Sequence, residues 1–348
     1  MHVAFLYNRS TEDPAHGAED ELPARSPVVA ALKRLGHSVT PIACTLDLAS
    51  VRRRLVRAIP DVVFNRVESL GGSDAMMAAI TLLLDTMRLP YTGNSTAALA
   101  ATASKISVKE WLARAGLPTP RWFCTGDKDV PAHLYLQSEI RDQRYILKSV
   151  YEHASFEMDD DSVVGPMSQD GVVELLQVRE ATTGRPYFAE QFIDGREFNL
   201  SLIGDAPEVL PSAEIDFSTF PAGKPHIVGH AAKWKVGSHE FHHTPRRFDF
   251  SASDGQLLRR LKELAVYCWR LFELCGYARV DFRCDTAGQP WILEINTNPC
   301  IAPDAGFAAA LNQAGIGYDD GIKCILDDAL GRCPLANQPA RCPHMVRI

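Results

Sequence analysis

The strongest local signal in the sequence is Tyr277-Ala278-Arg279-Val280-Asp281, followed after a turn by Leu293-Glu294-Ile295-Asn296-Thr297-Asn298-Pro299. Polar and apolar residues alternate in both runs. The turn signal at 285–288 lies between them, so the pattern predicts paired antiparallel strands at 277–284 and 291–295. Residues two apart on a strand face the same side of the sheet. If the strands pair, Asp281, Glu294 and Asn296 converge as a set of oxygen ligands.

This ligand set favours Mg²⁺ or Mn²⁺ over zinc, because hard divalent cations prefer carboxylate and amide oxygens. Two carboxylates and one amide leave coordination positions open for water and phosphate oxygens. The alternative, from spacing alone, is a surface hairpin whose acids are solvated.

The rest of the chain alternates strand and helix patterns over its first hundred residues. Strands are predicted at 2–8, 37–44 and 61–68, and helices at 27–35, 46–59 and, capped by Ser73, at 73–87. Strands separated by helices indicate a parallel sheet with helices on its faces. Further along, the pattern predicts helices at 104–115 and 253–275 and strands at 145–148, 187–193, 197–203 and 208–217.

Composition limits the class of protein. The 348 residues carry 36 Lys and Arg against 43 Asp and Glu, a formal charge of −7. This acidic balance argues against a general nucleic-acid coat. The apolar runs are shorter than the ~20 residues of a membrane helix, so no membrane partner is expected. The N-terminal run has no basic segment before it, and the nine cysteines form no Cys-x-x-Cys pair. We therefore expect a cytoplasmic protein with reduced thiols.

Three lysines stand at positions suited to phosphate oxygens. Lys105 lies near the start of a helix, Lys148 ends an apolar strand, and Lys233 follows Ala231-Ala232. For each of them the alternative is a solvated surface group. The sequence holds no Walker loop and no G-x-G-x-x-G pattern, so phosphate has to be held in another way.

Two other motifs suggest different chemistry. His239-Glu240-Phe241-His242-His243 satisfies H-E-x-x-H, which binds zinc only on a continuous helix. Gly237-Ser238 before it and Thr244-Pro245 after it disfavour such a helix and a zinc hydrolase, and favour a polar turn or a loop that faces substrate. Cys300 is a second candidate, as a nucleophile, but no paired base is identifiable.

Taken together and in order, the motifs resemble the D-alanine–D-alanine ligase branch of the ATP-grasp superfamily. The matching runs span about residues 85–330 and include Leu89–Gly93, Ile146–Lys148, Glu190–Ile193, Gly195–Phe198 and the two strands of the hairpin. The resemblance implies a mixed α/β and α+β structure, an ATP-grasp fold with an N-terminal Rossmann-like parallel α/β lobe. The implied limits are 1–102 for that lobe, 103–187 for a central lobe, 188–330 for a C-terminal lobe and 331–348 for a tail.

The resemblance also implies how ATP is bound. The implied ATP contacts are Lys105, Lys148, Glu190, Gln191, Ile193, Glu197 and Lys233, and the implied ligands of two Mg²⁺ ions, with Mn²⁺ as a substitute, are Asp281, Glu294 and Asn296. The lysines would hold phosphates, residues 190–193 would read adenine, and Glu197 would accept the ribose hydroxyls. Lys233 would reach the terminal phosphate from a mobile loop, and Arg279 would stabilise charge on the reacting carboxyl group.

The implied activity is that of an ATP-dependent carboxylate–amine ligase. A carboxylate attacks the γ-phosphate to give an acyl phosphate and ADP, and an amine then displaces phosphate to form an amide. Two alternatives stay open: D-alanine–D-alanine ligase itself, and a regulatory protein that binds ATP without turnover. The expected partners are small amino-acid-like carboxylates and amines, and the superfamily's habit of dimerising allows a homodimer.

The sequence departs from the family pattern on its amino-acid side. His153 and Ala154 stand where the family has a glycine and its first serine, whereas Glu152 and Ser155 match. Cys300 replaces a glycine, and Asn65-Arg66-Val67-Glu68 replaces a His-Gly motif. The candidate substrate residues are Glu68, His153, Ser155 and Cys300. We predict that D-alanine is not the natural substrate pair.

Overall fold

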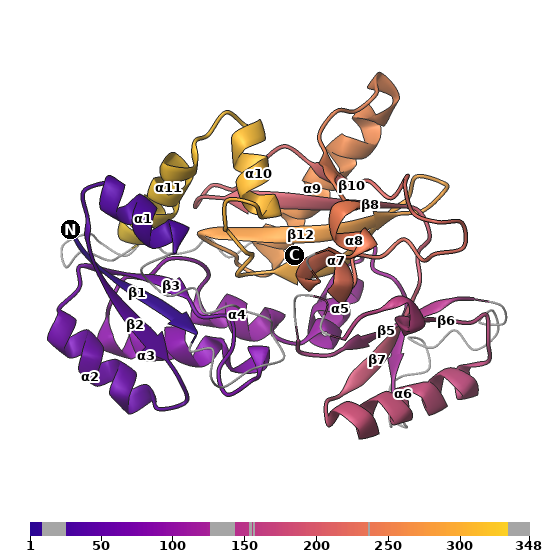
Figure 1. Ribbon diagram of the computed structural model, residues 1–348, viewed down its shortest axis with the longest axis horizontal. Helices are drawn as coiled ribbons and strands as arrows, with labels where there is room; N and C mark the ends of the chain where they lie inside the picture. The colour runs from indigo at the N-terminus through magenta and orange to yellow at the C-terminus, as the bar shows by residue number, and fades with distance from the viewer. Residues whose placement is uncertain (9–25, 126–142, 153–154, 156, 236, 333–348) are drawn as a thin grey trace.

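A computed structural model describes residues 1–8, 26–125, 143–152, 155, 157–235 and 237–332 (Figure 1). The predicted role of His153 and most of the predicted tail lie outside the described residues. Within the described part, the strands form three sheets. No helix of the described part is long and apolar enough to cross a membrane.

The N-terminal sheet is parallel, as the alternation of strands and helices predicts. Its strand order is β2 (Ser38–Cys44), β1 (His2–Asn8), β3 (Val62–Arg66). Successive side chains of β1 point to opposite faces, so Ala4 and Leu6 pack with α2 (Leu48–Ala58) and α3 (Ala78–Met87). Val3 and Phe5 pack on the other face, with α1 (Pro27–Arg34).

The central sheet is antiparallel, in the order β4 (Trp122–Cys124), β7 (Tyr187–Gln191), β5 (Tyr145–Ser149), β6 (Val163–Val164). Helix α6 (Gln169–Thr183) covers it through Val172 and Leu176. The resemblance implies a C-terminal lobe from residue 188 onward, but β7 pairs with β4 and β5. We therefore propose to place the limit between the central and C-terminal lobes after Gln191.

The C-terminal sheet contains the hairpin predicted at 277–284 and 291–295. Its order is β11 (Arg246–Arg247), β10 (Ala213–Ile215), β8 (Arg196–Ile203), β12 (Tyr277–Cys284), β13 (Pro290–Asn296), with β9 (Glu208–Val209) beside β8. The predicted antiparallel pairing of β12 and β13 is confirmed. The single strand expected at 208–217 is wrong, because β9 and β10 are separate short strands. Helices α4 (Thr96–Thr102), α5 (Lys105–Arg114) and α9 (Gly255–Leu271) share the core of this sheet.

The last two helices return to the N-terminal sheet. Helices α10 (Gly306–Gln313) and α11 (Tyr318–Gly331) pack in one apolar core with α1, β1 and β3 (Figure 1). Arg34 of α1 pairs with Asp319 of α11, with Nη2 and Oδ1 2.6 Å apart. The N-terminal sheet and the C-terminal helices therefore form one packed unit.

The loop at 89–94 anchors the start of β12. Buried Asn94 donates from Nδ2 to the carbonyls of Tyr277 and Thr297, each at 2.8 Å, and its Oδ1 accepts the Cys275 amide at 2.9 Å. Gly276 has a φ of +70°, and a Cβ there would lie 2.8 Å from the carbonyl oxygen of Gly93. Only glycine permits this approach, so the loop and hairpin are held in register.

Candidate active site

The hairpin brings the predicted metal ligands together on one side of the C-terminal sheet. Strand β12 lies between β8 and β13, so Asp281 stands opposite Glu294 on β13 and Asn199 on β8. Two residues away on β12, Arg279 stands opposite Asn296. These pairings place the two carboxylates and the amide within one patch of the sheet, as the spacing predicts.

Asp281 is the centre of this patch. Arg279 binds its carboxylate in a fork, with Nε to Oδ1 and Nη2 to Oδ2 both at 2.7 Å. Asn199 donates to Oδ1 at 2.8 Å. Burial alone would lower the pKa of Arg279, but the charge and hydrogen bonding of Asp281, together with the charges of Glu294 and Glu197, raise it. Each carboxylate oxygen carries two lone pairs, so Asp281 can bind a cation while it keeps Arg279. The all-oxygen donor set fits a divalent metal ion such as Mg²⁺.

Glu197 extends the charged row along the same strands. It faces Arg283 across the β8–β12 pair, with Oε2 3.3 Å from Nε. Burial raises the pKa of Glu197, and Arg283 opposes that effect. The Arg283 guanidinium is itself fixed by the Gly195 carbonyl at 3.0 Å. A buried carboxylate held by one ion pair retains acceptor sites for hydroxyl groups.

The central sheet contributes a buried charge triad. Glu190 on β7 contacts two ammonium groups: Lys148 Nζ lies 2.7 Å from Oε1, and Lys109 Nζ lies 2.7 Å from Oε2. Burial alone would raise the pKa of Glu190, but the two lysines hold it below its ordinary value. Gln191 ends β7, and Ile193 is buried in the segment that leads to β8.

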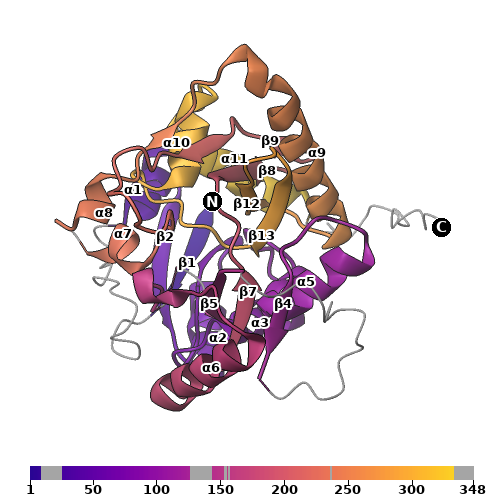
Figure 2. The ribbon, with the colours of Figure 1, turned by 90° about the vertical axis from the view of Figure 1, so that its right-hand side faces the viewer.

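Lys105 interacts electrostatically with groups of both the central and the C-terminal sheets. It is buried at the start of α5 and donates from Nζ to the carbonyl of Glu152. Burial lowers its pKa, and the charges of Glu294 and Asp74 act in the opposite direction. The nearby charge of Lys148 lowers it further. Lys105 therefore lies within electrostatic reach of both the hairpin and the central sheet, which Figure 2 shows one above the other.

Lys233 lies on the short helix α7 (His230–Trp234). Burial lowers its pKa, and the positive charge of Arg279 lowers it further against the opposing charges of Glu294 and Asp281. The segment of Lys233 is tied to the central lobe, because Ser155 donates from Oγ to the Val228 carbonyl at 2.6 Å. The charges of Arg279, Glu294 and Asp281 thus act on Lys233, and its role at the terminal phosphate stays a prediction.

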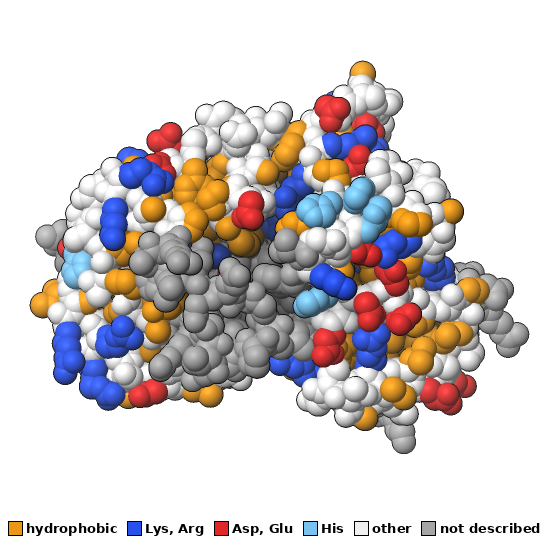
Figure 3. Space-filling model, viewed as in Figure 1, with side chains coloured by type: hydrophobic (Ala, Val, Ile, Leu, Met, Phe, Trp, Pro, Cys, Tyr) orange, Lys and Arg blue, Asp and Glu red, His pale blue; other side chains and the backbone are white. Residues whose placement is uncertain are grey.

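A second contact ties the same segment to the central lobe. Lys224 Nζ lies 2.5 Å from Asp160 in the central lobe and 2.8 Å from Glu240 on α8 (His239–His242). This contact lowers the pKa of Glu240 to about 2. Figure 3 shows histidine, acidic and basic side chains gathered on this face of the molecule.

The H-E-x-x-H motif does not form a zinc site. Helix α8 is a single turn, and the rings of His239 and His243 stack at a centroid distance of 3.9 Å. Glu240 is engaged by Lys224. Within the described ranges, no group of three His, Cys, Asp or Glu side chains could hold a metal ion. The short helix α8 stands where the flanking residues predict a polar turn or a loop.

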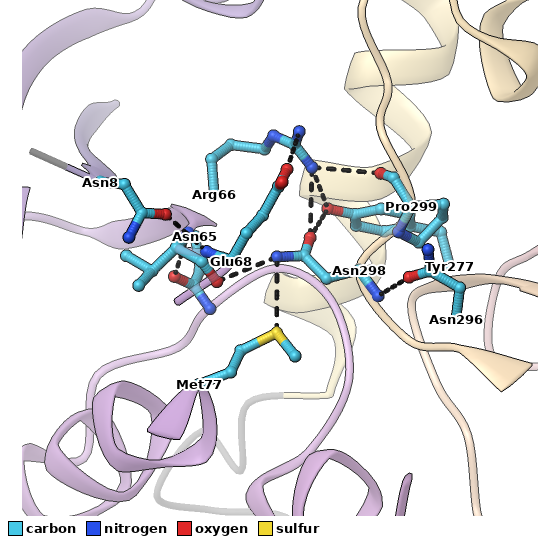
Figure 4. A network of polar contacts seen from close by, with 10 residues as sticks. Asn8, Asn65, Arg66, Glu68, Met77, Tyr277, Asn296, Asn298 and Pro299 are labelled. Carbon is cyan, nitrogen blue, oxygen red and sulfur yellow. Dashed lines mark hydrogen bonds and ion pairs between the residues drawn. The ribbon is translucent and has the colours of Figure 1, made fainter. Parts of the chain in front are cut away.

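The residues predicted to form the amino-acid side lie where the end of β3 meets the chain that follows β13 (Figure 4). Glu68 contacts Arg66, with Oε1 2.7 Å from Nη2, and Cys300 follows the Asn298-Pro299 turn. Desolvation raises the pKa of the Cys300 thiol, although the charge of Arg66 lowers it. A raised pKa disfavours the thiolate, so it does not support the nucleophile hypothesis. Ser155 binds Val228 as described above.

Sequence reasoning missed two charged residues of this region. Lys109 lies four residues after Lys105, and that spacing places both on one face of α5, which is a signal that could have found it. Arg66 ends β3. The carboxyl ends of parallel strands commonly meet ligands, so its position was a second usable signal.

Comparisons with known proteins point to one family. The family model described as the D-ala D-ala ligase C-terminus matches residues 175–327. A D-alanine–D-alanine ligase of Halorhodospira halophila is 30% identical over 90% of this chain and 93% of its own. One from Moorella thermoacetica is 29% identical over 95% of this chain and 99% of its own. The crystal structure of D-alanine–D-alanine ligase from Bacillus anthracis complexed with ATP superposes with a TM-score of 0.69 at 18% identity, and covers 95% of this chain and 98% of that one.

Proposed function

This chain belongs to the D-alanine–D-alanine ligase family of ATP-grasp enzymes, and on that basis we propose that it joins a small carboxylate to an amine through an acyl phosphate. It is an ATP-dependent ligase that forms a C–N bond. The observation that carries the finer proposal is the row of Asp281, Glu294 and Asn296 beside Arg279 on β12 and β13. ADP and phosphate are the expected products.

Residues on the central and C-terminal sheets, on helices α5 and α7 and between β7 and β8 supply the ATP contacts in this proposal. Lys105, Lys148 and Lys233 bind phosphate oxygens, and Glu197 accepts the ribose hydroxyls. Adenine lies against the segment of Glu190, Gln191 and Ile193. Because each lysine is at least partly withdrawn from water, its interaction with a phosphate is stronger than on an open surface.

Asp281, Glu294 and Asn296 would hold two Mg²⁺ ions, or Mn²⁺ in their place, in the same proposal. Bound Mg²⁺ supplies neutralisation of negative charge on the phosphate oxygens. Arg279 lies beside these ligands and stabilises negative charge on the carboxyl group that reacts. The segment of Lys233, tied to the central lobe by Val228 and Lys224, keeps water from the acyl phosphate.

The substrate class follows from the side that departs from the family. Glu68 presents a carboxylate that is half exposed and suits the ammonium group of an amino acid. Ser155 and Cys300 line the neighbouring positions in the proposal. We retain the prediction that the natural pair is not two D-alanines, in a cytoplasmic enzyme with small-molecule partners and, as the family allows, a homodimer. The names of the relatives favour the alternative, D-alanine–D-alanine ligation itself.

ADP release across a panel of amino acids and small carboxylates tests the proposal. We expect ATP- and Mg²⁺-dependent release that requires both a carboxylate and an amine, with the amide product identified by mass spectrometry. Rapid release with D-alanine alone would favour the family activity. ATP binding without ADP release under every condition would favour the regulatory alternative.

A further inference from the structure

Arg66 is a cation of the N-terminal lobe that contacts the catalytic hairpin (Figure 4). Its Nη1 donates to Asn298 Oδ1 at 3.2 Å and to the Pro299 carbonyl at 3.1 Å. Its Nη2 is held by Glu68 at 2.7 Å. The side chain is only 13% exposed, and the guanidinium is therefore fixed between the two lobes.

Asn298 receives contacts from both lobes. Its Oδ1 accepts from the Tyr277 hydroxyl at 2.9 Å as well as from Arg66. Its Nδ2 donates to the Val67 carbonyl at 3.0 Å. The amide group of Asn298 is thus oriented by β12 on one side and by the end of β3 on the other.

Asn298 in turn fixes the side chain of Asn296. The Asn298 backbone N–H donates to Asn296 Oδ1 at 2.9 Å. This oxygen is the atom with which Asn296 would bind a hard cation. It retains a second lone pair, and the bond from Asn298 sets the direction in which that lone pair points. A relay therefore runs from Arg66 through Asn298 to Asn296.

Outer groups of this kind orient metal ligands, and removing them commonly weakens metal affinity or activity about 10–100-fold. A lysine would keep the positive charge but lose the planar fork that binds Asn298, Pro299 and Glu68 together. Charge alone is therefore insufficient for the relay.

We propose that Arg66 is a positioning residue that sets the geometry of the metal site from the N-terminal lobe. The inference rests on the proposed role of Asn296 as a metal ligand. It goes beyond that role, because it makes metal binding depend on a lobe that supplies none of the ligands named above.

Direct Mn²⁺ binding tests the inference without turnover. Free Mn²⁺ is measured by electron paramagnetic resonance with the full chain and a non-hydrolysable ATP analogue. We expect Arg66→Lys and Asn298→Ala each to weaken Mn²⁺ binding about 10–100-fold. The double variant should bind Mn²⁺ no more weakly than the more weakly binding of the two single variants, because both changes break one relay. Arg34→Gln is the matched control. This arginine ends α1 and forms an exposed ion pair with Asp319, so the variant should bind Mn²⁺ as the wild type does.

The outcomes separate the inference from the proposed function. Equal Mn²⁺ affinity in the wild type and Arg66→Lys would overturn the relay and leave the ligase proposal intact. No nucleotide-dependent Mn²⁺ binding by the wild type would overturn the metal site and the relay together. A parallel measurement of analogue affinity without metal should be unchanged in Arg66→Lys, and a matching loss there would show general damage to the structure and overturn the positioning role.

Discussion

Replacement of Lys109 by methionine should destabilise the protein from inside the charge triad. The Lys109 side chain is 0% exposed, and its Nζ contacts Glu190 and, at 2.9 Å, Thr119 Oγ1. Methionine fills much of the same volume, so the change mainly removes the contacts of Nζ with Glu190, Thr119 and the Pro120 carbonyl, which a neutral amine would keep. Removing one partner from a buried ion pair costs about 3–5 kcal/mol. Because Lys148 still neutralises Glu190, we expect the lower end, about 3 kcal/mol, or roughly a hundredfold in the unfolding equilibrium.

Urea unfolding, followed by tryptophan fluorescence and circular dichroism, measures this loss. Trp122 is a local reporter, because its ring centroid lies 5.6 Å from Lys109 Nζ. The control is Lys323→Met, which removes an exposed ion pair with Asp327 and should change the unfolding free energy by less than about 0.5 kcal/mol. If Lys109→Met loses no more than this control, the reasoning about the buried triad is refuted.

The other predictions concern the same site. Asp281→Asn should stay folded but lose about a thousandfold in Mg²⁺-dependent ADP release, since one charge pair at 4 Å is worth about 4 kcal/mol near a protein surface; near-wild-type rates would disprove its metal role. Glu197→Ala should raise KM for ATP more than it lowers kcat, and an unchanged KM would exclude the ribose contact. Burial lowers the pKa of Lys109 from 10.5 to about 8. Between these values the unfolded chain binds more protons, so the wild type should gain stability as pH rises through this window, and Lys109→Met should lack that gain. Cys300→Ser should retain turnover in the ADP assay, and its abolition would revive the nucleophile hypothesis.

Local sequence patterns predicted most of the fold. The parallel N-terminal strands and the β12–β13 hairpin follow from the alternation of residues along each strand, and the structure confirms them. Helix α6 was missed because few of its side chains are buried, Val172 and Leu176 among them, and they do not form a clear apolar stripe. The predicted helix at 73–87 begins instead with a 3₁₀ turn at Asp74–Met76, followed by α3.

The site was predictable where spacing or resemblance named the residue type. The predicted convergence of Asp281, Glu294 and Asn296 depends on the two-residue period of a strand, which can be recognised in the sequence itself. The partners of Lys109 and Arg66 could not be inferred in this way. Glu190 lies 81 residues after Lys109, and Asn298 lies 232 residues after Arg66. Such contacts depend on how the three sheets assemble, and no local pattern records that assembly.

The shared core of the first and last segments has a mechanical consequence. Separating α1 from α11 would expose Val29, Leu32, Ile325 and their neighbours to water, which is costly. The central sheet has a smaller core of its own, under α6. The low-energy hinge motion is therefore a swing of the central sheet against a rigid frame built from both ends of the chain. The distance between two labels on α6 and α9 should change when nucleotide exchanges, whereas the distance between two labels on α1 and α11 should stay constant.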